Sequence, residues 1–278
     1  MRYQGQGVRA GRLPSGDPRE RGRLVKLARI LFDGRAREAL VAAGGYSLRD
    51  GDDAGTLVAI ESARLLPPAE PTKVIAVGWN FPEHIREMVA RLPVSTFPET
   101  PAEPIIFYKP LSSLVAHGEP IVYPRDATRV EHEGELVVVM GSPARRVDAA
   151  EARRLVRGWT CGNDVTERDM QRRDKQWWRA KGYDTFAAVG PYLETETPEG
   201  SARIVTRVNG QVRQEGRVAD MLRDPFEIIA YVSQAVTLLP GDMIMLGTPP
   251  GVGALLPGDT VEVEVDGIGC LSNPVVAE

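Results

Sequence analysis

Three glutamates, Glu131, Glu133 and Glu135, stand directly before the aliphatic residues 136–140. On a strand, alternate residues share a face, so these side chains are expected on one side at intervals of roughly 7 Å. The aliphatic residues must be buried, which places Glu133 and Glu135 at the margin of a core, where an unpaired carboxylate is costly. A divalent cation would relieve that cost. Oxygen ligands favour Mg²⁺, with Mn²⁺ or Ca²⁺ as substitutes.

A third carboxylate is needed for such a site, and Asp164 offers one between a predicted strand and a predicted helix. His132 is expected on the opposite face of the acidic strand, which disfavours a zinc site of His and Glu within that strand. Two other interpretations stay open. The acidic run is also typical of a solvated edge paired with arginines, and Asp164 of an ordinary helix cap.

His84 and Glu87 stand three residues apart within a predicted helix at 81–90. That spacing places both side chains on one helix face. A carboxylate that orients an imidazole makes a competent general base near neutral pH. The pair is therefore either a surface contact or, because a proline-rich loop at 92–104 follows it, part of a lid that closes over a ligand.

The glycine-rich segment 247–253 follows a predicted strand but lacks the Lys-Ser/Thr pair of a phosphate loop and the helix of a dinucleotide fold. ATP and NAD binding are therefore disfavoured. The amides of 251–253 and the Thr248 hydroxyl could hold a small carboxylate, although a plain turn has the same spacing. Lys181 follows a tryptophan pair, and by itself is expected to be a surface lysine.

The elements that must position these residues are mostly strands. Residues 24–66 predict a small β unit and the prolines at 67–71 a linker. Further strands are predicted at 73–77, 105–108, 121–123, 136–140, 159–162, 203–208, 211–213, 243–246 and 260–265, with a tight hairpin turn at Asn209-Gly210. Helices are predicted at 81–90, 149–157, 166–178 and 225–238, the last capped by Asp224. Without strand–helix alternation or a repeat, this pattern predicts a mixed α+β, β-dominated fold.

Composition excludes several classes of protein. The chain has 278 residues, which fits one large domain or one large and one small. A net charge of −4 argues against a nucleic-acid or membrane-surface binder, so a small molecule is the expected partner.

The two cysteines cannot build a disulfide framework, and no run approaches the roughly 18 apolar residues of a membrane span, so the cytoplasm is the expected compartment. Residues 1–23, rich in Gly and Arg, are expected to be a disordered tail.

Taken in order, these motifs resemble the fumarylacetoacetate hydrolase family in its compact bacterial type. The matching residues are Gly78-Trp79-Asn80, His84 to Met88, Lys109-Pro110, Glu133 to Leu136, Asn163-Asp164, Arg168-Asp169 with Gln171, Lys181 with Asp184 to Phe186, Gly247 to Pro249 and Gly251 to Gly253. Ordered motifs from about residue 73 to the C-terminus are far more specific than any one of them. The resemblance implies a β-roll catalytic domain at 71–278, assembled as a homodimer. The small β unit predicted from the strand and turn pattern then forms a separate N-terminal β domain at 24–70.

The resemblance also implies roles for individual residues. Glu133, Glu135 and Asp164 would hold Mg²⁺ or a substitute ion, His84, Glu87 and Lys181 would be catalytic, and Arg168, Gln171, Thr248 and Gly251 would bind substrate. Glu131 stands where the family commonly has Asp, so it is left out of the predicted metal shell.

The implied activity is hydrolysis of a 2,4-dioxo acid of the acylpyruvate or fumarylpyruvate type. His84, oriented by Glu87, would take a proton from a water that attacks the 4-carbonyl, and the bond between carbons 3 and 4 would break to release pyruvate as an enolate. Oxaloacetate decarboxylation and isomerisation of a 2-hydroxyhepta-2,4-diene-1,7-dioate are alternatives at the same metal. A calcium-binding β module is the non-enzymatic alternative.

Overall fold

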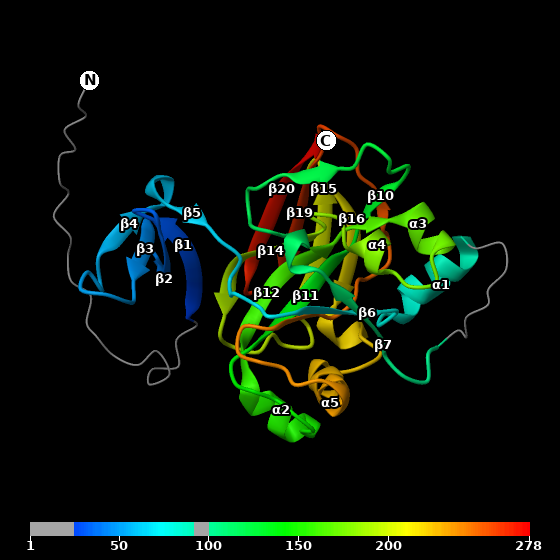
Figure 1. Ribbon diagram of the computed structural model, residues 1–278, viewed down its shortest axis with the longest axis horizontal. Coiled ribbons are helices and arrows are strands. Elements are labelled where there is room, and N and C mark those ends of the chain that lie inside the picture. Colours follow the sequence, from blue (N-terminus) through cyan, green and yellow to red (C-terminus); the bar gives the residue numbers. More distant parts are fainter. Residues whose placement is uncertain (1–24, 92–99) are drawn as a thin grey trace.

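The computed structural model describes residues 25–91 and 100–278. The predicted disordered tail at 1–23 and residues 92–99 of the predicted proline-rich loop lie outside the described residues. Figure 1 shows a small N-terminal β unit at one end of a larger β body, with short helices around that body.

The N-terminal unit is built from five strands. These are β1 (Lys26–Phe32), β2 (Arg35–Ala42), β3 (Gly45–Leu48), β4 (Leu57–Ala59) and β5 (Arg64–Leu65). The turn at Asp33-Gly34 has positive φ at both residues, which a type I′ two-residue hairpin requires. Strand β1 also pairs with β14 (Ala187–Glu194), so hydrogen bonding continues from this unit into the larger sheet. The division into domains at residue 70 stays a prediction.

The largest sheet runs from the N-terminal unit through the larger β body. Its order is β4-β3-β2-β1-β14-β12-β11-β17-β6-β7, with β8 (Leu114–Val115) beside β14 and β5 beside β1. Its further strands are β6 (Val74–Gly78), β7 (Ile105–Lys109), β11 (Gly134–Met140), β12 (Val156–Asp164) and β17 (Met243–Met245). Strands β11 and β12 are central and antiparallel, so residues far apart in the sequence come together at their ends.

A second sheet packs against the first. Its order is β16 (Gln211–Arg217), β15 (Arg203–Val208), β19 (Thr260–Val265), β20 (Gly269–Ala277) and β9 (Ile121–Tyr123). Asn209 and Gly210, between β15 and β16, have φ of 52° and 76°, as the predicted hairpin turn requires. Three short strands, β13 (Thr166–Glu167), β10 (Val130–His132) and β18 (Gly253–Ala254), form a third small sheet.

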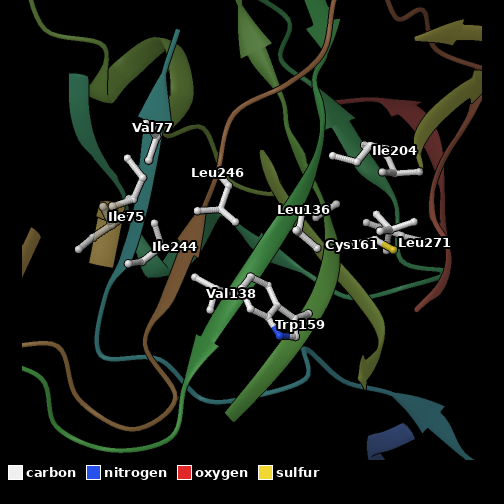
Figure 2. Close-up of a cluster of buried hydrophobic side chains, with 14 of the residues drawn as sticks. Ile75, Val77, Leu136, Val138, Trp159, Cys161, Ile204, Ile244, Leu246 and Leu271 are labelled. Atoms are coloured by element: carbon white, nitrogen blue, oxygen red, sulfur yellow. The ribbon is translucent and has the colours of Figure 1, made fainter. Parts of the chain in front are cut away.

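The main core lies between the two large sheets. Figure 2 shows Leu136 and Trp159 from the first sheet between Ile75 on one side and Ile204 and Leu271 of the second sheet on the other. All five are at most 1% exposed. Burial of this apolar area is the dominant favourable term that holds β11 and β12 in place.

Helices close the rim of the body. They are α1 (Pro82–Arg91), α2 (Ala149–Leu155), α3 (Arg168–Arg173), α4 (Trp178–Lys181) and α5 (Pro225–Ala235), with short 3₁₀ turns at Ile60–Ser62, Leu111–Ser113 and Val218–Asp220. The Asp224 carboxylate accepts a hydrogen bond from Phe226 N at 2.8 Å, which confirms the predicted cap of α5. The β-dominated α+β class is confirmed.

Two sequence predictions are wrong in detail, and two strands were not predicted. The acidic run is not one strand: β10 and β11 belong to different sheets, and the chain passes between them at Glu133. The predicted helix at 166–178 is a strand and two short helices, with Asp174 ending the first of them. Strands β14 and β20 were not predicted, although buried side chains line both.

Candidate active site

Three carboxylates converge where β11 and β12 meet. Glu133, Glu135 and Asp164 each offer an oxygen atom, and these atoms lie within 4.8 Å of one another. Their side chains are 5%, 1% and 1% exposed. Glu133 lies at the junction before β11, Glu135 on β11, and Asp164 at the end of β12. The three predicted metal ligands are therefore adjacent, inside the protein.

Backbone contacts explain why these residues meet. Asp164 N donates to Glu133 O at 2.9 Å, and the Asn163 side-chain oxygen accepts from Glu133 N at 2.9 Å. Gly134 allows the chain to pass close to β15, since a Cβ there would lie 2.0 Å from Thr206 Oγ1. Asp164 is not a helix cap: the Glu167 carboxylate caps α3 by accepting from Met170 N.

Three buried cations face this acidic cluster. Lys181 Nζ lies 2.7 Å from Glu133 Oε2 and 2.7 Å from Asp164 Oδ2. Lys109 Nζ contacts the other oxygen of Asp164, and Arg168 Nη2 donates to Glu133 Oε1 at 2.7 Å. Lys181 is only 2% exposed, so the expectation of a surface lysine is wrong. Lys181 is buried because it ends the helical turn of α4 and its ammonium packs against the ring of Phe107.

The charges act differently on the two glutamates. Burial raises the pKa of the Glu133 carboxyl, but the charges of Lys181 and Arg168 outweigh it and hold that pKa below its ordinary value. Burial, together with the charges of Asp164 and Glu133, raises the pKa of Glu135 well above its ordinary value. Among the described residues, Glu135 accepts one hydrogen bond, from Gly247 N at 2.7 Å, and has no cationic side chain within ion-pair distance.

The donor set fits a hard divalent ion. Three carboxylates within reach of one point repel each other, and Glu135 lacks the counter-charge that Glu133 and Asp164 have. A small cation bound by oxygen would supply that charge. The alternative of a solvated acidic edge is wrong because all three side chains are buried. Arginine pairing does occur: Arg168 pairs with Glu133 of the triad and also donates from Nε, at 2.7 Å, to Glu131, which lies outside the triad.

His84 and Glu87 lie on helix α1 beside this cluster. His84 is 4% exposed, so the pair is not a surface contact. Its Nδ1 lies 3.5 Å from Glu87 Oε2 and has no hydrogen-bond partner among the described residues. Burial raises the pKa of Glu87, but the imidazole, the Gly251 N–H and the Arg91 charge outweigh it and lower that pKa. A positive charge on the His84 imidazole would also lower the pKa of Glu133, so the imidazole is within electrostatic reach of the triad.

The four predicted substrate-binding residues surround the site but already have protein partners. Arg168 Nη1 donates to half-buried Gln171 at 2.6 Å. The Thr248 hydroxyl donates to Gly134 O at 2.8 Å. Gly251 N donates to Glu87 Oε2 at 2.9 Å, so this amide of the expected carboxylate cradle is already bound to helix α1. These contacts position the site, and the roles of these residues in binding stay predictions.

Two residues of the site were not predicted. Lys109 is 2% exposed and belongs to the Lys109-Pro110 motif. A lysine at the end of an apolar strand could have indicated a buried functional residue. Gln214 of β16 accepts from Gly134 N at 3.0 Å and donates to Thr248 Oγ1 and Pro249 O, both at 2.7 Å. No sequence signal marks Gln214, because its role depends on how the second sheet packs against β11.

This fold is that of a known family. The family model of the fumarylacetoacetate (FAA) hydrolase C-terminal domain matches residues 73–276, and the chain belongs to that family. The resemblance inferred from the motifs, and with it the fold class, is therefore confirmed. Members of the family generally use a divalent metal.

Individual relatives carry several activity names. The human protein named oxaloacetate tautomerase FAHD2A, mitochondrial, is 40% identical over 224 residues, which cover 76% of this chain and 69% of the relative. A crystal structure of 5-carboxymethyl-2-hydroxymuconate delta-isomerase from Mycobacterium smegmatis is 39% identical with a TM-score of 0.80, and covers 91% of this chain and 100% of its own. Fumarylacetoacetate hydrolase from psychrophilic Exiguobacterium antarcticum is 34% identical with a TM-score of 0.78, at the same coverage. These relatives carry enzyme names and differ in reaction type.

The described part of the chain contains no helix long and apolar enough to cross a membrane.

Proposed function

We propose that this protein is a divalent-metal-dependent hydrolase that cleaves the carbon–carbon bond between C3 and C4 of a 2,4-dioxo acid of the acylpyruvate or fumarylpyruvate type. One observation carries the proposal. A buried imidazole with a carboxylate behind it, His84 with Glu87, lies within electrostatic reach of a carboxylate cluster that can hold a cation. A general base next to a Lewis acid is the arrangement that activates water towards a carbonyl.

Glu133, Glu135 and Asp164 would hold the ion, and Mg²⁺ is the choice that an all-carboxylate donor set favours. When bound, such an ion supplies a Lewis acid for the carboxylate and 2-oxo oxygens of the substrate. Lys181 and Lys109 hold Glu133 and Asp164 in place, because both lysines donate hydrogen bonds within the cluster. The protein thus provides a rigid set of ligands before any ion arrives.

In the proposed reaction, His84 takes a proton from a water molecule whose oxygen forms a bond to C4, while the π pair of the C4 carbonyl moves onto its oxygen until the C3–C4 bond breaks and the carbonyl re-forms. Glu87 holds the imidazole and balances the positive charge that it gains. The bond between C3 and C4 then breaks, and its electron pair stays on the pyruvate fragment as an enolate. The buried Lys181 ammonium stabilises that negative charge, an electrostatic effect typically worth several kcal/mol. A proton returned to C3 completes pyruvate, and C4 leaves as a carboxylic acid.

Isomerisation or tautomerisation of an oxo acid is the second candidate, favoured by the names of relatives at 39–40% identity. Such a reaction needs the same enolate stabilisation but moves a proton between substrate atoms instead of adding water. Decarboxylation of oxaloacetate makes the same demand. In isomerisation or tautomerisation His84 would carry the substrate proton itself, and in decarboxylation it would deliver a proton to the enolate left when CO₂ departs.

A substrate panel tests the proposal. The purified full chain with Mg²⁺ or Mn²⁺ is assayed against acetylpyruvate, fumarylpyruvate, oxaloacetate and a 2-hydroxyhepta-2,4-diene-1,7-dioate. Pyruvate release from either of the first two supports the hydrolase. Proton exchange or double-bond migration without cleavage supports the isomerase or tautomerase, and CO₂ release supports the decarboxylase.

Oxalate binding distinguishes an enzyme from a calcium-binding module. Oxalate resembles the pyruvate enolate in charge and in its pair of chelating oxygens. Calorimetry should detect oxalate only when Mg²⁺ or Mn²⁺ is present. Tight Ca²⁺ binding, with no oxalate binding and no turnover of any oxo acid, would favour the binding module.

A further inference from the structure

Helix α1 carries His84 and Glu87 and ends at Arg91, which has no assigned role. The guanidinium Nη2 donates to Glu87 Oε1 at 2.5 Å and to the Val252 carbonyl at 3.0 Å. Its Nη1 lies 3.8 Å from Glu131 Oε2. One side chain therefore contacts helix α1, the glycine-rich turn and the acidic segment before β11.

The contact with Glu87 fixes the direction of that carboxylate. The terminal torsion of a glutamate is broad, so one hydrogen bond alone leaves the group free to rotate. Here Arg91 takes Oε1, and the other oxygen, Oε2, faces Gly251 N at 2.9 Å and His84 Nδ1 at 3.5 Å. The two oxygens have separate partners, so Oε2 points at the imidazole.

Arg91 also links helix α1 to the acidic cluster. Its neighbour Glu131 accepts from Arg168 Nε at 2.7 Å, and Arg168 Nη2 donates to Glu133 Oε1 at 2.7 Å. The chain of charged contacts thus runs from Glu87 through Arg91, Glu131 and Arg168 to Glu133. A planar guanidinium with several donors suits this bridging position, and a lysine ammonium does not reproduce its geometry.

We propose that Arg91 is a positioning residue for the base pair: it holds the Glu87 carboxylate towards His84 and fixes helix α1 against the glycine-rich turn and the acidic segment. This inference rests on the proposed function in one respect, namely that His84 with Glu87 moves a proton. Arg91 itself need not touch the substrate.

Steady-state kinetics of the full chain with metal provide the first test. We expect Arg91→Ala to lower kcat by roughly tenfold to a hundredfold, the usual loss when a partner that orients a functional side chain is removed, with little change in KM. Arg91→Lys should recover only part of the loss. The matched control is Arg86→Ala, on the same helix, because Arg86 is exposed and pairs with the exposed Glu83. Equal rates for Arg91→Ala and Arg86→Ala would overturn the proposal.

A double-mutant cycle separates positioning from general support of the fold. If Arg91 acts through Glu87, then Arg91→Ala should cause little further loss in a Glu87→Gln background. Losses that multiply independently in the two backgrounds would show that Arg91 acts elsewhere and would overturn the proposal.

A spectroscopic test needs neither metal nor substrate. The chain has three histidines, so nitrogen-15 spectra of the ring nitrogens can be assigned by single substitutions. Arg91→Ala should shift the Nδ1 signal of His84 in the folded protein, and Arg86→Ala should leave it in place. An unmoved Nδ1 signal would overturn the role of Arg91. Failure of every oxo acid to turn over would instead reject the proposed function, and the spectra would still decide the role of Arg91.

Discussion

Asp242 and Glu135 are both buried carboxylates on or beside the central sheet, yet their surroundings differ. Asp242 accepts hydrogen bonds from Thr72 N at 2.8 Å, Thr72 Oγ1 at 2.7 Å, Lys73 N at 3.1 Å and Leu239 N at 2.7 Å, and pairs with the Lys73 ammonium. Glu135 accepts one such bond, from Gly247 N, and faces Glu133 and Asp164. Burial raises the pKa of both carboxyls, but at Asp242 the donors outweigh burial and lower the pKa.

The difference separates a structural carboxylate from one that is arranged for a ligand. The donors of Asp242 come from its own fold, so the charge is compensated as soon as the chain folds. At Glu135, burial and the neighbouring acids Asp164 and Glu133 outweigh the opposing charge of Lys181 and raise the pKa, so a proton or a cation must enter the cluster to compensate this carboxylate. Burial alone does not identify a functional acid; the identity of its neighbours does.

The largest expected effect is on the base beside this cluster. His84→Ala should lower the hydrolytic rate by roughly 10²–10⁴-fold, the usual contribution of a positioned general base. Because His84 is not one of the three clustered acids, Mn²⁺ binding should persist. Rates and Mn²⁺ calorimetry on the same preparation check both statements. Undiminished turnover would remove the imidazole from the mechanism.

The contrast between Glu135 and Asp242 is tested by measuring how much a bound ion raises the free energy of unfolding. At 100 times its Kd, an ion that binds only the folded chain adds about 2.7 kcal/mol to the free energy of unfolding. Mn²⁺ should produce such a gain in the wild type and in Asp242→Asn, but not in Glu135→Gln. Urea unfolding with and without Mn²⁺ measures it. A gain that survives in Glu135→Gln would place the ion elsewhere.

Asp242 should matter for stability in a pH-dependent way. We expect Asp242→Asn to lower the free energy of unfolding at pH 7 by about 1.5–3 kcal/mol, the range for hydrogen bonds to a charged group. The folded pKa lies below the ordinary value of 3.8. The stabilisation is therefore present above that value and is lost as the pH falls through the folded pKa. Unfolding curves from pH 7 downwards should show the two proteins converging in acid; a constant difference would contradict this account.

The smallest effect is expected for an exposed pair on helix α1. Glu83 and Arg86 are both more than 60% exposed, so water screens their attraction. Arg86→Ala should change the free energy of unfolding by no more than about 0.5 kcal/mol. Thermal melts of the full chain check it, and a larger loss would mean that helix α1 depends on this pair.

Much of the local structure could be predicted from the sequence, because its causes are local. The Asn209-Gly210 turn and the Asp224 cap follow from the backbone preferences of those residues. Strands β14 and β20 escaped prediction because their mixed sequences, Gly-Pro-Tyr within β14 among them, carry no clear alternation. Their assignment depends on neighbours far away in the chain.

The candidate site could also be predicted only in part, because its arrangement depends on residues far apart in the chain. The acidic types at 133, 135 and 164 identified a potential hard-ion site, and ordered motifs identified the family. The expected single strand was nevertheless wrong, since the chain changes sheets at Glu133. The buried positions of Lys181 and Lys109 were not foreseen from the residues alone, because a lysine in a sequence is ordinarily a surface residue.

The amino-acid sequence by itself determined which chemical groups are present, the local turns and caps, and the family to which the chain belongs. Tertiary structure alone decided which charges face one another: Asp164 reaches Glu133 through β11–β12 pairing, and Arg91 reaches Val252 across 161 positions of sequence. The physical reason is that electrostatic compensation depends on distance and burial. Both are set by how the sheets pack, and neither is encoded in a short stretch of residues.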